Sequence, residues 1–296
     1  MFKYPDVIEL ISELCKKEED LEKRTKILQE RIGYWNEKKL IYHLSHVGVI
    51  PETFEHDSSE EKFYAKYCDV LIYGFFKLYG MDAELVTTRG DQPDVIGRLR
   101  NKYVIIADAK AFRLSRTALN PKDYKISAVD RWKKQQNADY ACLVSSFFPK
   151  GRSRLFQEAV THGVALLSYA HLQYILLDPN WRSIDLESLW QIPLLLSRTK
   201  NVNVDSNKYW KIIRKWLNDN VNAKERLDRI EETYIKNIIE EGKRQIACLE
   251  EEKKKISTLS KEEMIKRLSR EIDRKISQVR EKINELSNME NLNMFF

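Results

Sequence analysis

The chain has 296 residues, of which 43% are hydrophobic and 32% charged, and its net charge is +6. This length and composition suffice to bury the core of one large domain or two smaller ones, and they exclude a disordered chain, a collagen-like repeat and a small disulfide-rich protein. No apolar run reaches the roughly 18 residues that a membrane span needs, and the N-terminus lacks the order of a secretory signal, so we expect a cytoplasmic protein without a membrane partner.

Residues 1–82 are predicted to form a helical region that packs on the core. Apolar residues recur at helical spacing over residues 7–14. Further along, Ser58 and Glu61 form an S-x-x-E capping box, which is typical of a helix start. An apolar stripe follows this box and stops at Gly80, which is a natural helix end. We therefore expect a long capped helix just before the core begins.

Residues 83–178 change to the apolar pattern of strands. Short β-rich runs lie at 84–88, 94–99, 103–109, 140–145 and 164–168. Helical patterns lie near 127–136, 154–162 and 170–177. Strands that come first and then alternate with helices predict an α/β core, in which helices flank a mixed central sheet on both faces.

Residues 179–220 connect this core to a long charged helical hairpin over residues 221–296. Ser260 and Glu263 make a second capping box, so the hairpin turn is expected near 257–261. The second helix has a seam of apolar residues at Leu268, Ile272, Ile276, Val279, Ile283 and Leu286. The hairpin either packs on its own core or forms a dimer contact, and the sequence does not favour one over the other.

The net positive charge is concentrated in one stretch, residues 110–134, which we call the basic segment. It holds eight basic residues and two acidic ones, and the rest of the chain sums to zero. A concentrated positive surface suits a polyanion, because each neutralised phosphate releases condensed counterions. Charged runs are nevertheless more often only solvated faces.

Two acidic residues and a lysine lie at the ends of neighbouring predicted strands. Pro93-Asp94 begins one strand, and Asp108-Ala109-Lys110 ends the next after an almost wholly apolar run. Because side chains alternate along a strand, Asp108 and Lys110 share a face. If the strands pair, Asp94 and Asp108 can hold a hard cation, for which Mg²⁺ is expected, with the Ala109 carbonyl as a further ligand. Lys110 would then stabilise charge on a phosphate during phosphodiester hydrolysis.

This P-D and D-x-K pattern is the short signature of the PD-(D/E)xK nuclease superfamily. Taken alone it also fits an ordinary surface ion pair at a strand end, but here the basic segment starts at the proposed catalytic lysine. The longer run 107–118, continuing through Asn120, Lys122, Asp123 and Lys125, closely resembles the active-site and recognition segment of the HindIII-like type II restriction endonucleases. Weaker similarity extends over about 50–177.

The resemblance implies a restriction-endonuclease-like core and specific site residues. Asp94, Asp108 and Lys110 match the family's metal-binding and catalytic positions, and Asp123 matches a possible additional acid. It also implies a homodimer that needs Mg²⁺ and hydrolyses double-stranded DNA at a palindromic six-base-pair site, AAGCTT, leaving 5′ overhangs. A cognate DNA methyltransferase is expected in the same cell, without direct contact.

The DNA-recognition segment is expected at residues 111–134. Asn can pair bidentately with adenine, so Asn120 is the first candidate for a base contact, although Asn120-Pro121 also suits a plain turn. Two further sets of DNA-binding residues follow from their positions. Lys122, Asp123 and Lys125 are expected at base edges or phosphates, and Arg113, Ser115 and Arg116 at the DNA backbone.

Two other functions stay open beside the restriction endonuclease. One is a PD-(D/E)xK nuclease of repair or recombination that recognises DNA structure rather than sequence. The other is a DNA-binding scaffold that has the carboxylates but does not cut.

Overall fold

The computed structural model describes residues 4–86, 91–115, 120–149, 153–198, 204–257, 260–266 and 269. The chain divides into two compact units, Met1–Lys243 and Arg244–Phe296. Among the described residues, no helix has both the length and the hydropathy needed to cross a bilayer.

A mixed sheet forms the centre of the first unit. Within the described residues its five strands follow the order β2-β3-β4-β6-β7. They are β2 (Asp82–Leu85), β3 (Val95–Leu99), β4 (Tyr103–Lys110), β6 (Tyr140–Ser145) and β7 (Val164–Leu167). The first three strands pair antiparallel, and β4, β6 and β7 pair parallel. This confirms the predicted mixed sheet.

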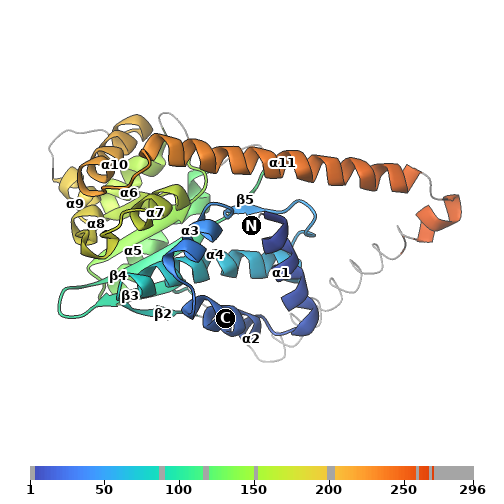
Figure 1. Cartoon of the computed structure of the whole chain (residues 1–296), viewed down its shortest axis with the longest axis horizontal. Coiled ribbons are helices and arrows are strands. Elements are labelled where there is room, and N and C mark those ends of the chain that lie inside the picture. Colours follow the sequence, from blue (N-terminus) through green and yellow to red (C-terminus); the bar gives the residue numbers. More distant parts are fainter. Residues whose placement is uncertain are drawn as a thin grey trace, which may run out of the picture. The chain divides into compact units, whose positions relative to one another are not determined.

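Helices cover both faces of the sheet, as predicted (Figure 1). Four of the described helices come before it: α1 (Tyr4–Lys17), α2 (Leu21–Gly33), α3 (Glu37–Leu44) and α4 (Ser59–Leu78). After these come α5 (Ile126–Gln135), α6 (Arg154–His162), α7 (Tyr169–Leu176), α8 (Leu186–Trp190), α9 (Ile192–Ser197), α10 (Ser206–Asn220) and α11 (Leu227–Ser257), and residues 261–266 are helical as well. Short elements complete the described chain: β1 (Val49–Ile50) pairs with β5 (Phe112–Arg113), and 3₁₀ turns form at η1 (Pro121–Tyr124) and η2 (Trp181–Ser183).

Helix α4 is the long capped helix that the sequence predicts. The Ser58 hydroxyl accepts a hydrogen bond from the Glu61 backbone N–H at 3.2 Å, and this caps the helix start. Gly80 follows the helix end with a φ of 89°, a left-handed conformation that favours glycine. Most of α4 is buried, because it packs against β2, β3 and β4 on one side and against α1, α2 and α3 on another.

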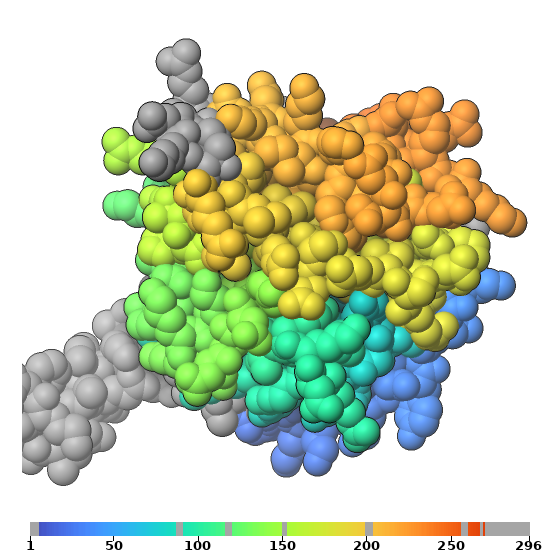
Figure 2. Space-filling view, turned by 90° about the vertical axis from the view of Figure 1, so that its left-hand side faces the viewer, coloured from blue at the N-terminus to red at the C-terminus, as the bar shows by residue number. Residues whose placement is uncertain are grey.

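The connecting segment after α7 packs on the edge of the sheet that is formed by parallel strands. Helix α8 contacts β6 and β7, and α9 contacts β7 and α6. In Figure 2 this segment, in yellow, lies next to a teal surface, which by the colour bar belongs to residues near 100. Helices α8 and α9 therefore cover the sheet at its β6–β7 side.

Strand β2 is shifted from its predicted position. It runs from Asp82 to Leu85, whereas the sequence pattern predicted 84–88, of which residues 87 and 88 lie outside the described part. The reason is its antiparallel register with β3, in which Leu85 already faces Val95 at the end of the ladder.

The predicted second capping box is present. The Ser260 N–H donates to Glu263 Oε2 at 2.8 Å, and the Glu263 N–H donates to Ser260 Oγ at 3.2 Å. The predicted seam from Leu268 to Leu286 lies outside the described residues, so the hairpin and its packing stay predictions. The same holds for the predicted boundaries of the four regions.

Candidate active site

The end of the β3–β4 pair brings two acidic residues together. Val95 faces Ala107 in this antiparallel ladder, so the next pair along it is Asp94 with Asp108. The two carboxyl groups share a hydrogen bond. Strand pairing therefore places them as the sequence predicted.

Lys110 lies on the same face of β4 as Asp108. Its Nζ is 2.5 Å from Asp108 Oδ2. Asp108 is only 2% exposed, and the Lys110 side chain is largely buried. The end of β4 is held in place because the Lys110 carbonyl accepts a hydrogen bond from the Tyr169 hydroxyl at 3.1 Å. The structure thus brings Asp94, Asp108 and Lys110 into one cluster.

Helix α4 adds two charged residues that the sequence analysis missed. Lys66 Nζ lies 2.8 Å from Asp94 Oδ1 and 3.1 Å from Asp69 Oδ2, so it bridges the two carboxylates. Asp69 is buried within an otherwise apolar helix face. That interruption of the apolar run Cys68 to Ile72 is the signal that could have marked Asp69 as a site residue.

Burial and mutual repulsion separate the pKa values of the two central acids. Burial, together with the negative charge of Asp94, raises the pKa of Asp108 to about 7, although Lys110 opposes the change. Burial would also raise the pKa of Asp94, but the hydrogen bond from Asp108 and the charge of Lys66 outweigh it and lower that pKa. The pKa of Asp108 is therefore the higher of the two.

These residues fit a hard divalent cation. Carboxylate oxygens are the ligands that Mg²⁺ prefers, and Asp94 and Asp108 present them side by side. A buried carboxyl whose pKa is raised by a neighbouring carboxylate is ionised when a cation relieves the repulsion. A second acidic group, His56, Asp57 and Glu61, has ligand atoms within 4.8 Å of one another, but His56 and Asp57 are exposed and the group lies outside this cluster.

The predicted recognition segment, residues 111–134, contains a capped turn. Asn120 Oδ1 accepts from the Lys122 N–H at 3.0 Å, and Asp123 Oδ2 accepts from the Asn120 N–H at 3.0 Å. Lys125 follows with a φ of 48° and joins the turn to α5. The side chains of Asn120, Lys122 and Lys125 are exposed. The turn that the sequence predicted at Asn120-Pro121 is therefore present, and it exposes these polar groups at the surface.

Arg113 and Ser115 are engaged within the protein. The Arg113 guanidinium donates to Glu61 Oε1 at 2.9 Å and to the carbonyl of Phe54 at 2.8 Å. The Ser115 N–H and hydroxyl both donate to Glu52, at 2.8 and 2.9 Å. A DNA contact for either residue stays a prediction, and Arg116 lies outside the described residues.

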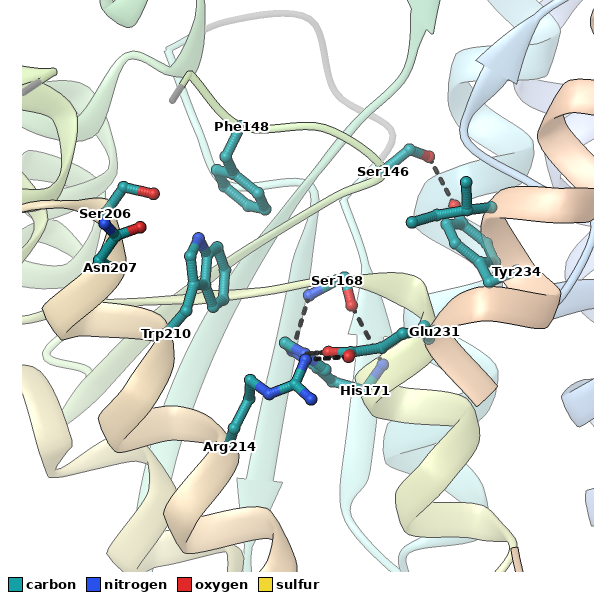
Figure 3. Close-up of a pocket in the computed structure, with 12 residues that line it drawn as sticks. Ser146, Phe148, Ser168, His171, Ser206, Asn207, Trp210, Arg214, Glu231 and Tyr234 are labelled. Atoms are coloured by element: carbon teal, nitrogen blue, oxygen red, sulfur yellow. Dashed lines mark hydrogen bonds and ion pairs between the residues drawn. The ribbon is translucent and has the colours of Figure 1, made fainter. Parts of the chain in front are cut away.

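A separate cavity of about 520 Å³ lies between α7, α10 and α11, beyond the ends of β6 and β7 (Figure 3). His171 Nδ1 accepts from the Ser168 N–H, so Nε2 carries the proton and donates to Glu231 at 3.1 Å. Arg214 pairs with the same carboxylate, and Trp210 packs beside the group. The lining residues do not include Asp94, Asp108 or Lys110. The charged groups that line this cavity bind one another, which is typical of structural ion pairs.

Comparison with known proteins gives consistent matches. The model of the HindIII restriction endonuclease family matches residues 5–285. Type II restriction enzyme HindIII of Haemophilus influenzae is 31% identical over 276 residues, which are 90% of this chain and 90% of that protein. The solved small subunit R.BspD6I2 of the heterodimeric restriction endonuclease R.BspD6I aligns with 13% identity and a TM-score of 0.35, over 53% of this chain and 90% of that subunit.

Proposed function

Because the chain belongs to the HindIII restriction endonuclease family, and is therefore a type II site-specific deoxyribonuclease, we propose that Asp94, Asp108 and Lys110 are its catalytic residues. The observation that carries this proposal is their convergence at the end of β3 and β4. Perturbed pKa values among adjacent buried acids are typical of such sites.

The cofactor is Mg²⁺, held by Asp94, Asp108 and the Ala109 carbonyl. When bound, this ion would polarise the scissile phosphate and lower the pKa of a bound water. The Lys110 ammonium stabilises the negative charge that develops on the phosphate, because it lies in a buried setting where such interactions are strong. Lys66 contacts the carboxylates of both Asp94 and Asp69 and restricts their rotation. It therefore keeps the Asp94 carboxylate oriented toward the cluster.

The substrate is double-stranded DNA with the palindromic site AAGCTT, cut to leave 5′ overhangs. The support is the 31% identity to HindIII over 90% of both chains. A two-fold symmetric sequence is read most simply by a two-fold symmetric protein, so the chain acts as a homodimer. A cognate methyltransferase protects the host site.

DNA recognition falls to the turn at η1 and its surroundings. Asn120 reads a base edge, and the exposed ammonium groups of Lys122 and Lys125 contact bases or phosphates. Asp123 orients Asn120 through the capping box. Arg116 is proposed as a further contact to the DNA backbone, whereas Arg113 and Ser115 hold the loop around Glu52.

Digestion of one sequenced plasmid tests this function. We expect discrete fragments that map to every AAGCTT, cleavage only with Mg²⁺ present, and fragments with 5′ overhangs that a polymerase can fill in. Discrete fragments that map to another sequence would support a sequence-specific nuclease but refute the proposed recognition site. Activity that persists after chelation with EDTA would refute the metal requirement.

A further inference from the structure

Asp91 lies three residues before Asp94 and binds two side chains of helix α5. Its Oδ1 accepts a hydrogen bond from Trp132 Nε1 at 2.8 Å, and its Oδ2 pairs with the Arg131 guanidinium. Both bonds lower the pKa of Asp91, the Arg131 bond most, so the carboxylate is held in its charged form. The Asp91 carboxylate thus ties the chain just before β3 to α5.

The short chain from Asp91 to Asp94 leaves little slack. Three residues span at most about 10 Å, and Pro93 removes one backbone torsion from the connection. Beyond it, the Asp94 carbonyl accepts from the Val86 N–H at 2.9 Å, and β3 then enters the sheet. A displacement at Asp91 therefore reaches the Asp94 carboxylate within a few bonds.

Helix α5 connects directly to the recognition turn. It begins at Ile126, immediately after Lys125, and Lys125 closes the η1 turn that starts with Asn120. Trp132 is only 7% exposed, so its ring is fixed in the core while its N–H reaches Asp91. Helix α5 therefore connects η1 to the chain segment that leads to Asp94.

We propose that Asp91 is a positioning residue that makes the placement of Asp94 depend on the position of the recognition turn. This inference rests on the proposed catalytic role of Asp94. In the proposed arrangement, cognate DNA that binds η1 also fixes the position of α5. Through its bonds to α5, Asp91 then fixes the position of the Asp94 carboxylate. A DNA sequence that binds η1 poorly leaves Asp94 misplaced. The enzyme therefore discriminates between DNA sequences in the cleavage step as well as in binding.

The energetics separate this role from a structural one. The Asp91 side chain is 57% exposed, and exposed ion pairs contribute little to stability. A misplacement of about 1 Å at a reacting centre, in contrast, can lower a rate by about 100-fold. Loss of Asp91 should therefore leave the fold intact and reduce the cleavage step.

The test compares Asp91→Ala with a matched control, Glu84→Ala. Glu84, on the neighbouring strand β2, also forms an exposed ion pair, with Arg98 at 3.1 Å. Arg98 belongs to β3, so this pair does not involve α5. Three quantities are measured on the full chain: the single-turnover cleavage rate on a saturating duplex with the mapped site and Mg²⁺, duplex affinity with Ca²⁺ in place of Mg²⁺, and the melting temperature.

For Asp91→Ala we expect a cleavage rate reduced about 10- to 100-fold, with duplex affinity changed less than about twofold and the melting temperature nearly unchanged. Glu84→Ala should behave as the unmodified chain. Trp132→Phe removes the indole N–H but keeps a ring, so it should reduce the rate, and combining it with Asp91→Ala should add little because both changes break one link.

Two results would overturn the inference. One is an Asp91→Ala rate equal to that of Glu84→Ala, and the other is a loss of rate that parallels a loss of folding or affinity. Asp94→Asn separates this outcome from a failure of the proposed function. If Asp94→Asn is inactive while Asp91→Ala is normal, only the positioning role is wrong; if Asp94→Asn cleaves at full rate, the catalytic assignment itself fails.

Discussion

Asp94 and Asp108 face each other across the β3–β4 pair, and their carboxyl groups share a hydrogen bond. The antiparallel register creates this contact, because it aligns the start of one strand with the end of the next. Burial and the charge of Asp94 raise the pKa of Asp108, whereas the hydrogen bond from Asp108 and the charge of Lys66 lower the pKa of Asp94. Neighbouring acids with separated pKa values are typical of sites where carboxyls take different roles.

Replacing Asp108 with Asn or Lys110 with Met should abolish cleavage while leaving folding intact. Asn keeps the volume of the side chain but cannot supply a carboxylate, and Met removes the ammonium that lies 2.5 Å from Asp108. We expect rates at least about 100- to 1,000-fold lower, the range for losing one charge-stabilising group. Single-turnover cleavage of a saturating duplex measures the effect.

Duplex affinity in Ca²⁺ and the melting temperature are the controls for these two variants. Both should stay close to those of the unmodified chain. A variant that folds and binds normally and still cleaves within about threefold of the normal rate would contradict the catalytic assignment.

Lys66→Met should destabilise the fold, because it leaves the carboxyl groups of Asp69 and Asp94 without the cation between them. Breaking a fully buried pair costs about 3–5 kcal/mol, and we expect about 2 kcal/mol here because the Lys66 side chain is 25% exposed. Urea unfolding without added metal measures this change.

Adding Asp69→Asn to Lys66→Met provides the matched test. Burial and the charge of Asp94 raise the pKa of Asp69, so a neutral amide at this position should restore part of the lost stability. If the double variant is less stable than Lys66→Met alone, charge compensation is not the role of Lys66.

Asn120→Ser and Asn120→Ala separate the two roles of the residue at the start of η1. Ser caps a helical turn well but cannot pair bidentately with adenine, whereas Ala does neither. Asn120→Ser should keep the melting temperature and lose about 1–3 kcal/mol of discrimination at one base pair. The ratio of cleavage rates on the cognate duplex and on singly substituted duplexes measures discrimination.

Asn120→Ala should lose the same discrimination and also some stability of the turn. Equal weakening on every duplex, cognate or substituted, would assign Asn120 to the DNA backbone. Full discrimination in Asn120→Ser would leave it only its capping role.

The sequence predicted the features that depend on local patterns. Strand β4 was predicted within one residue because a short, β-rich apolar run before Asp108 is typical of a buried strand. Alternation along that strand then placed Asp108 and Lys110 on one face, and they do meet. The resemblance selected the restriction endonuclease from three functions that the residues alone left open, and the family comparison confirms that choice.

The parts that were missed depend on tertiary packing. Helical periodicity shows that one face of α4 is buried, but not that Asp69 and Lys66 on that helix meet Asp94 from a strand far along the chain. The contacts of Arg113 within the protein also depend on tertiary packing. Only the folded chain shows that Arg113 lies against Glu61, which is 52 positions away.

These contacts within the protein predict that Arg113 stabilises the fold. Its side chain is 16% exposed, and its planar guanidinium reaches Glu61 and the carbonyls of Pro51 and Phe54 together, which a single ammonium cannot do. Arg113→Met should cost about 3 kcal/mol in urea unfolding, and Arg113→Lys should restore only part of it.

DNA binding at several salt concentrations separates the two roles of Arg113. Lys122→Ala and Lys125→Ala remove exposed charges, so each should reduce the slope of log affinity against log salt by about 1 if its ammonium contacts a phosphate. Arg113→Met should leave that slope unchanged, because its charge is neutralised within the protein. A reduced slope in a fully stable Arg113→Met variant would instead show that this guanidinium contacts a phosphate in the DNA complex. Its contact with Glu61 would then belong to the DNA-free protein alone.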